Sequence, residues 1–195
     1  MSSYPVPTGA EYHRMIAGEP YRPGDPELTA VRAWARSLTF RYNHTPPEQD
    51  AERRAILRDL FGSSGRWCTI EPSLHVDYGL NLHIGEGFYA NANCVFLDVA
   101  PIRIGAGTMF GPAVQLLTAT HPVDAAERLS GRELGFPITI GSRVWLGGGV
   151  IVGPGVTIGD DVVVGSGAVV VKDLPDRVVA VGNPARVVRE LPPET

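Results

Sequence analysis

The stretch that decides the fold is residues 138–172, which read ITIGSRVWLGGGVIVGPGVTIGDDVVVGSGAVVVK. Every sixth residue is aliphatic, and a glycine follows each of the first five such positions. The aliphatic positions are Ile140, Leu146, Val152, Ile158, Val164 and Val170. This period is too short for a helix pair and does not fit a heptad. It indicates a parallel β-helix, in which short strands stack coil on coil and glycines allow the corners. An ordinary glycine-rich β domain would not keep this register.

The same spacing extends the coil toward the N-terminus. Apolar residues recur by six in three further runs, separated by slips of the frame, over residues 70–82, 84–96 and 104–116. We expect about five coils and a prism roughly 25 Å tall, at ~4.8 Å per coil. The coil should occupy residues 63–175, with a long loop at 118–137 and a C-terminal cap at 176–195. A loop of this length in a regular solenoid is more often functional than accidental.

Residues 1–62 are predicted to form an N-terminal arm and two short helices that pack on the coil. The segment 1–25 is rich in Pro, Gly and Tyr and is expected to be irregular, and apolar residues at helical spacing predict a helix over 26–40. The pattern Thr45-Pro46-Pro47-Glu48 is typical of a capping box at the start of a second helix, and Gly62 is placed to end it.

The composition is that of a globular protein, with 44% hydrophobic and 19% charged residues among 195. The formal net charge of −4 does not favour a nucleic-acid partner. Cys68 and Cys94 match no zinc spacing and are expected to be buried free thiols in a reducing compartment. Because no stretch has the length of a signal peptide core or a membrane span, we expect a cytoplasmic protein without a membrane partner.

Short motifs along nearly the whole chain, from about residue 12 to 190, resemble those of the maltose O-acetyltransferases. They are Met15-Ile16-Ala17-Gly18-Glu19 with Tyr21, Arg41-Tyr42-Asn43-His44, Asp77-Tyr78-Gly79, Phe88-Tyr89-Ala90-Asn91, Leu97-Asp98-Val99, Thr120-His121-Pro122, Val144-Trp145-Leu146-Gly147-Gly148 and Gly182-Asn183-Pro184-Ala185-Arg186. The chain thus resembles the maltose and galactoside acetyltransferase group of the hexapeptide-repeat acyltransferases.

This resemblance implies a three-sided, left-handed coil, although left-handed crossovers break the usual rule for parallel strands. It also implies acetyl-CoA as cosubstrate, a small sugar as acceptor and no required metal. A homotrimer is implied as well, with each active site built between two subunits.

Acetyl transfer to a hydroxyl requires a base, and imidazole titrates in the useful range. His121 opens the long loop and matches the catalytic position of the family, so we expect it to be the general base. Glu133, in the same loop, is expected to orient the imidazole. The alternative for Glu133 is a solvated loop charge.

Three further polar residues match acceptor-binding positions of the family, namely Asp77, Asn91 and Asp98. Their alternative is turn chemistry, because Asx residues favour corners for local reasons. The galactoside-type members have a serine at the position of Asp77 and a second acid at that of Val99. Both differences favour the maltose-type branch and leave the acceptor open.

The resemblance also places coenzyme A in a groove between coils, against Gly148, Ser166, Val171, Lys172, Arg186 and Arg189. The cationic side chains among these suit the nucleotide phosphates, although a solvated basic cap is the alternative. Trp145 stands one residue before the aliphatic position Leu146 and should point outward, where we expect it to line the groove.

The expected function is therefore acetyl-CoA-dependent O-acetylation of a maltose- or glucose-like sugar by direct attack. One alternative keeps the scaffold and changes the acceptor to serine, an antibiotic or an oligosaccharide. A zinc carbonic anhydrase on the same kind of β-helix needs three converging histidines, and His75, His83 and His121 lack the close spacing. A non-catalytic prism would leave the long loop and the basic cap unexplained.

Overall fold

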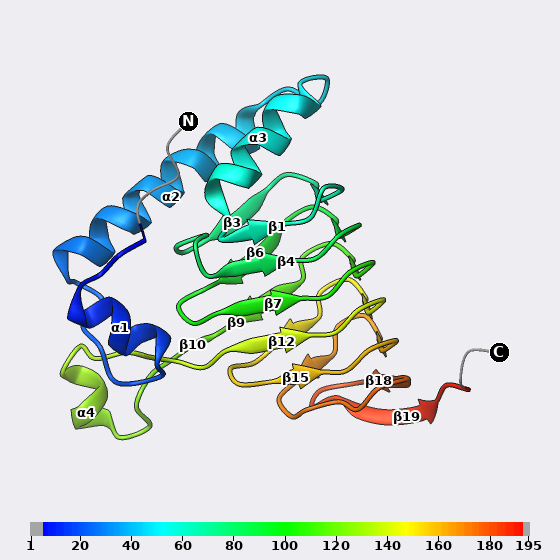
Figure 1. Ribbon diagram of the computed structural model, residues 1–195. Coiled ribbons are helices and arrows are strands. Elements are labelled where there is room, and N and C mark those ends of the chain that lie inside the picture. The colour runs from blue at the N-terminus through cyan, green and yellow to red at the C-terminus, as the bar shows by residue number, and fades with distance from the viewer. Residues whose placement is uncertain (1–5, 193–195) are drawn as a thin grey trace.

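Figure 1 shows a computed structural model of the chain, which describes residues 6–192. Parallel strands form a three-sided prism, and the strands on the near side run left to right as the coil descends, so the coil is left-handed (Figure 1). The first face contains β1 (Ser63–Ser64), β4 (Leu82–Ile84), β7 (Ile102–Ile104), β12 (Ile138–Ile140) and β15 (Thr157–Ile158). The second face contains β2 (Thr69–Ile70), β5 (Tyr89–Ala90), β8 (Met109–Phe110), β13 (Trp145–Leu146), β16 (Val163–Val164), β18 (Val178–Val181) and β19 (Arg186–Glu190). The third face contains β3 (Leu74–Val76), β6 (Cys94–Leu97), β9 (Gln115–Leu117), β14 (Ile151–Val152) and β17 (Val169–Val170). The first and the third face contain five strands each, in agreement with the five coils predicted.

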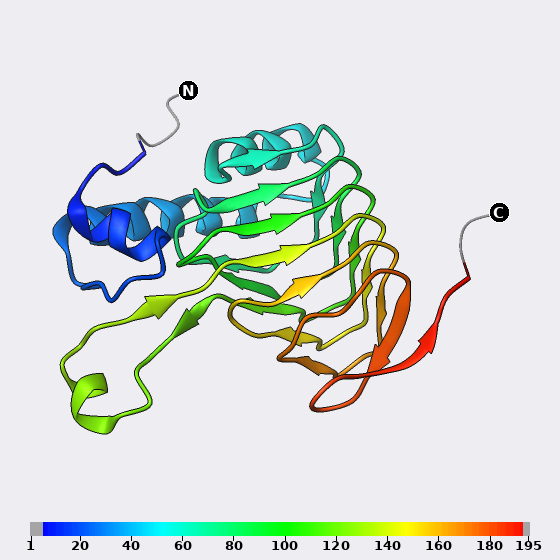
Figure 2. The same cartoon turned by 60° about the horizontal axis from the view of Figure 1, so that its bottom comes forward.

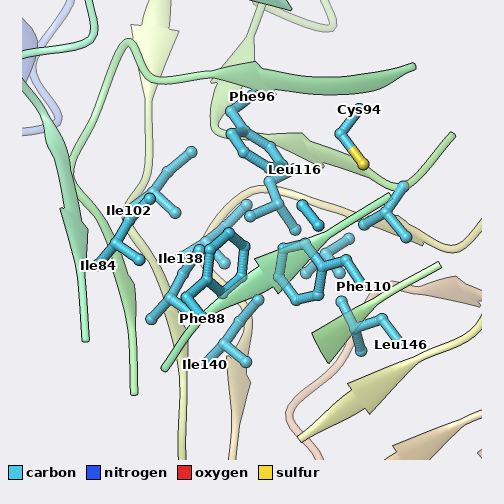
Figure 3. Close-up of a cluster of buried hydrophobic side chains, with 14 of the residues drawn as sticks. Ile84, Phe88, Cys94, Phe96, Ile102, Phe110, Leu116, Ile138, Ile140 and Leu146 are labelled. Atoms are coloured by element: carbon cyan, nitrogen blue, oxygen red, sulfur yellow. The ribbon is translucent and has the colours of Figure 1, made fainter. Parts of the chain in front are cut away.

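Aliphatic ladders fill the prism as the repeat predicts. On the first face, Ile84, Ile104, Ile140 and Ile158 stack in register through successive parallel pairs and are all buried. Aromatic rings contribute to the core of the upper coils, where Phe110 meets Phe88 edge to face with ring centroids 5.0 Å apart. Figure 3 shows this cluster of buried side chains inside the coil. The core thus continues through every coil.

The slip of the frame between Leu82 and Ile84 comes from the length of β4. This strand has three residues, and its outer two are buried while His83 between them points outward. Because side chains alternate along a strand, both frames identify core positions.

Several of the repeated glycines, among them Gly105, serve a different purpose from the one expected of corners. Gly105 has no positive φ, but a Cβ atom placed on it would lie 2.5 Å from the carbonyl carbon of Gly141 in the next coil. The left-handed conformation occurs two residues further on, where non-glycine residues such as Arg143 (φ 56°) and Asp161 (φ 59°) also adopt it. Close stacking of the corners, rather than backbone freedom, therefore requires glycine at Gly105.

The N-terminal region differs from its prediction at three places. The segment expected to be irregular contains α1 (Ala10–Ile16), and α2 (Pro26–His44) extends past residue 40. The third helix, α3, begins only at Asp50 and ends at Leu60. Thr45 does not open it, because its hydroxyl donates to the carbonyl of Arg41 and Thr45 closes α2. The capping-box prediction was therefore wrong.

The loop at 118–137 is a hairpin that projects from the prism beside α1 (Figure 2). At the base of this hairpin, β10 (Ala119–Thr120) pairs antiparallel with β11 (Leu134–Gly135). The tip contains the exposed helix α4 (Ala125–Leu129). The backbone NH of Phe136 donates to the carbonyl of Thr118 at 2.9 Å, so the chain returns to the coil where it left it.

The C-terminal segment begins as a further strand of the coil. β18 pairs parallel to β16 on the second face, and β19 folds back antiparallel to β18. In residues 6–192 no helix combines the length and the apolar character that crossing a membrane requires.

Candidate active site

A cleft of about 330 Å³ lies where the N-terminal arm, the coil and the projecting hairpin meet. It is lined by Tyr21, Pro23, Arg32, Arg36, Asp77, Tyr78, Leu97, Val99, Ala119, His121 and Glu133. Three of the five residues expected to act on the acceptor therefore share this cleft, namely Asp77, His121 and Glu133.

His121 directly follows β10 and is exposed. Among residues 6–192, no side chain or backbone group forms a hydrogen bond or ion pair with its ring. Both imidazole nitrogens are therefore available to a molecule in the cleft. An imidazole in this state can accept a proton from a bound hydroxyl.

Glu133 is held by the arm rather than by His121. Its carboxylate accepts a hydrogen bond from the Tyr21 hydroxyl at 2.7 Å, and the two backbones exchange NH–O bonds of 3.1 Å. Burial, followed by the hydrogen bond to Glu133, raises the pKa of Tyr21 well above its ordinary value, so the phenol is a stable donor. The predicted orientation of His121 by Glu133 stays a prediction, because the described residues show no hydrogen bond between the two.

Asp77 faces the cleft from the turn after β3. Desolvation raises the pKa of its carboxyl, while the nearby guanidinium of Arg32 opposes that shift. Arg32 itself is fixed, since it donates to the Tyr78 hydroxyl and to the carbonyl of Pro23, both at 2.5 Å. Asp77 thus presents an acceptor of hydrogen bonds inside a rigid polar wall.

Asp98 lies beneath this turn and not in the cleft. Its side chain has no exposed surface, and it accepts hydrogen bonds from the backbone NH groups of Asp77 (3.1 Å), Tyr78 (2.8 Å) and Asn81 (3.3 Å). Burial outweighs these bonds and raises the pKa of Asp98 to about 8. We therefore revise its expected role from contact with the acceptor to positioning of the turn that holds Asp77.

Asn91 is not brought to His121 within one chain. It follows β5, where the second face turns into the third, and its side-chain oxygen accepts from the backbone NH of Ala92 at 2.7 Å. This is the local turn chemistry that the sequence left open. Gly148 and Ser166 follow β13 and β16 at the same edge, in lower coils.

The remaining residues expected to bind coenzyme A are exposed on the lower coils and the cap. Trp145 points outward between Met109 and Val163, with 51% of its surface exposed, as its position predicts. Val171 and Lys172 follow β17, and Arg186 and Arg189 lie on β19. The cap and the hairpin that contains His121 lie on opposite sides of the molecule (Figures 1 and 2).

Sequence reasoning missed two cations of the cleft, Arg32 and Arg36. They are four residues apart on α2 and so share one helix face, a spacing that is visible in the sequence. Nothing in the sequence, however, places that face against the turn at Asp77. Tyr21 was part of a recognised motif, but no partner for it was predicted.

Comparison with known proteins gives the chemistry of this class. The model of the maltose acetyltransferase hexapeptide capping motif matches residues 14–65, and that of the bacterial transferase hexapeptide, in six repeats, matches residues 137–172. The structure of a maltose O-acetyltransferase from Clostridium difficile 630 is 46% identical, with a TM-score of 0.94 over 96% of this chain and 100% of that one.

Two further relatives agree. Galactoside O-acetyltransferase from Escherichia coli K12 is 39% identical over 91% of this chain and 88% of its own length. A hexapeptide-repeat acetyltransferase from Vibrio cholerae O1 biovar eltor, solved with acetyl coenzyme A, is 36% identical with a TM-score of 0.87, over 95% of this chain and 100% of that one. The fold is that of a hexapeptide-repeat acyltransferase. The chain belongs to the family of maltose and galactoside O-acetyltransferases and is an acetyltransferase.

Proposed function

We propose that this acetyltransferase moves the acetyl group of acetyl-CoA to a hydroxyl of a small sugar bound in the cleft, with His121 as the general base. The observation that supports this most is the unpartnered imidazole of His121 at one wall of a polar cleft whose other walls present Asp77 and Glu133. Carboxylates accept hydrogen bonds from several sugar hydroxyls at once, which would orient one hydroxyl toward the ring.

The transfer is a direct displacement. The hydroxyl oxygen forms a bond to the thioester carbonyl carbon as His121 removes its proton, and the carbon–sulfur bond then breaks. The imidazolium returns that proton to the departing thiolate, so the enzyme is regenerated. No covalent enzyme intermediate and no metal are needed for these steps.

The donor is proposed to lie along the edge formed by Gly148 and Ser166, with Trp145 and Val171 beside it. Gly148 allows a pantetheine chain to approach the backbone, and Lys172, Arg186 and Arg189 provide cations for the phosphates. A related hexapeptide-repeat enzyme was solved with acetyl coenzyme A, which supports this choice of donor.

We further propose a homotrimer in which the hairpin of one protomer reaches the donor edge of the next. The outward residues of the first face are polar, whereas those of the second face are apolar at Met109 and Trp145, each 51% exposed. The third face likewise turns Ile151 and Val169 outward. Two apolar faces beside one polar face suit a ring of three prisms.

The free, buried thiols of Cys68 and Cys94 support the cytoplasmic location that we propose.

Substitution of His121 tests the proposal. His121→Ala should lower kcat by about 10²–10⁴ with acetyl-CoA and a sugar acceptor, because that is the typical contribution of a positioned base. His13→Ala, which changes an exposed histidine of α1, is the matched control and should keep full activity. Full turnover in His121→Ala would refute the mechanism.

A panel of possible acceptors identifies the acceptor class. Glucose, maltose, serine and a lipid-linked oligosaccharide are each tested with acetyl-CoA, and the reaction is measured by the release of free thiol.

A further inference from the structure

A second cavity of about 540 Å³ lies next to the acceptor cleft, between α2 and β3. It is lined by Arg36, Thr39, Phe40, Asn43, His44, Ser73, His75 and Val76. Arg36 lines both cavities, so the two meet at one side chain. A molecule that fills the acceptor cleft and extends past Arg36 therefore enters the second cavity.

One wall of the second cavity is an exposed aromatic surface. Phe40 is 63% exposed, although Phe residues are usually buried. It stacks on the imidazole of His44, with centroids 4.0 Å apart and an angle of 28° between the planes. His44 is itself held, because its Nδ1 lies 2.8 Å from the carbonyl oxygen of Phe40. The pair thus forms a fixed flat platform against which the C–H face of a sugar ring can pack.

The polar groups of this cavity divide into two sets. The amide of Asn43 already has partners, because its NH2 group donates to the carbonyl of Leu74 and its oxygen accepts from the NH of Leu74, both at 2.9 Å. The hydroxyl of Thr39 donates to a carbonyl of its own helix. In contrast, the side chains of Arg36 and His75 form no hydrogen bond within residues 6–192. A hydrocarbon chain in the cavity would leave these two groups unsatisfied, whereas hydroxyl groups would pair with them.

We propose that this cavity is a distal acceptor subsite, which binds the sugar ring next to the one that is acetylated. An acceptor of two or more rings then spans from His121, past Arg36, to the Phe40 platform. This inference rests on the proposed function, since it assumes that the cleft at His121 binds the reacting sugar. The volume of the second cavity lies within the roughly 300–1,000 Å³ that is usual for ligand pockets.

The test compares Phe40→Ala with the wild type on glucose, maltose and maltotriose, at saturating acetyl-CoA. A lost aromatic contact should raise KM for maltose and maltotriose about three- to tenfold and leave glucose unchanged. His75→Ala should also raise KM for maltose and maltotriose and leave KM for glucose unchanged. Trp67→Ala, which removes another exposed ring (64% exposed) that lines neither cavity, is the control.

Two results would overturn the subsite. One is an equal change, or none, on all three sugars in Phe40→Ala. The other is a lower molecular mass of that variant by light scattering, which would mean that Phe40 packs against a partner copy. Failure of the proposed function looks different, because the wild type would then acetylate none of the sugars, or His121→Ala would acetylate them at full rate.

Discussion

The hydroxyl of Tyr21 donates a 2.7 Å hydrogen bond to the carboxylate of Glu133, across 112 residues of sequence. Because the backbones of the two residues also pair, this contact fastens the hairpin that contains His121 to the N-terminal arm. The arm thus lines the cleft that we propose to bind the acceptor, so we expect its residues to affect catalysis without touching the donor.

Tyr21→Phe removes this bond and keeps the ring. We expect a loss of about 1 kcal/mol in the free energy of unfolding and a several-fold rise in acceptor KM, with acetyl-CoA KM unchanged. Tyr12→Phe is the matched control, since its hydroxyl, in the same arm, bonds Asn81 rather than the hairpin. Steady-state kinetics and urea unfolding measure both effects. An unchanged acceptor KM in Tyr21→Phe would show that the hairpin needs no such fastening.

Asp98→Asn places an amide among three backbone donors. We therefore expect the free energy of unfolding of the variant to be about 1–3 kcal/mol lower than that of the wild type. The loss should depend on pH. Burial raises the pKa of Asp98 from 3.8 to about 8, so its contribution is complete below about pH 4 and is lost as the pH rises to about 8. The stability advantage of the wild type over Asp98→Asn should therefore shrink across that range in urea titrations. An advantage that grows with pH would contradict the assignment of a raised pKa.

Removal of the cations of β19 tests the proposed donor site. The double variant Arg186→Ala, Arg189→Ala should raise KM for acetyl-CoA about tenfold and leave the acceptor KM unchanged, because each guanidinium offers charge-assisted bonds to phosphate. Arg103→Ala, on the polar first face, is the control. An unaltered KM for acetyl-CoA would mean that these arginines are only a solvated cap.

The apolar second face gives a test of assembly. Met109→Glu should lower the mass measured by sedimentation equilibrium from that of the proposed trimer toward that of one chain, because burial of a charge in an interface is costly. Arg103→Glu on the first face should keep the trimer. If Met109→Glu keeps the full mass as well, the second face is not an interface.

The coil was predictable because each of its strands obeys a local rule. A β-helix repeats the same contacts, so the spacing of Ile140, Leu146 and Val152 predicts the ladder without knowledge of distant residues. The same reasoning failed at Thr45, where two local patterns competed and the end of α2 prevailed over the start of α3.

The site was predictable only in part, and mostly through resemblance. His121 and Glu133 lie in one loop, so their common cleft followed from sequence, but Arg32 and Arg36 come from a helix whose docking on the turn at Asp77 no local pattern predicts. The burial of Asp98 also depends on neighbouring coils, and its sequence surroundings are the same for a surface turn and for a buried one.

The coil itself is undisturbed by the hairpin inserted into it. β7 and β12 flank the insertion, yet Ile102, Arg103 and Ile104 pair in unbroken register with Ile138, Thr139 and Ile140. The prism therefore does not depend on the inserted hairpin for its register, and we expect it to tolerate tips of other lengths at α4, provided that His121 and Glu133 are kept.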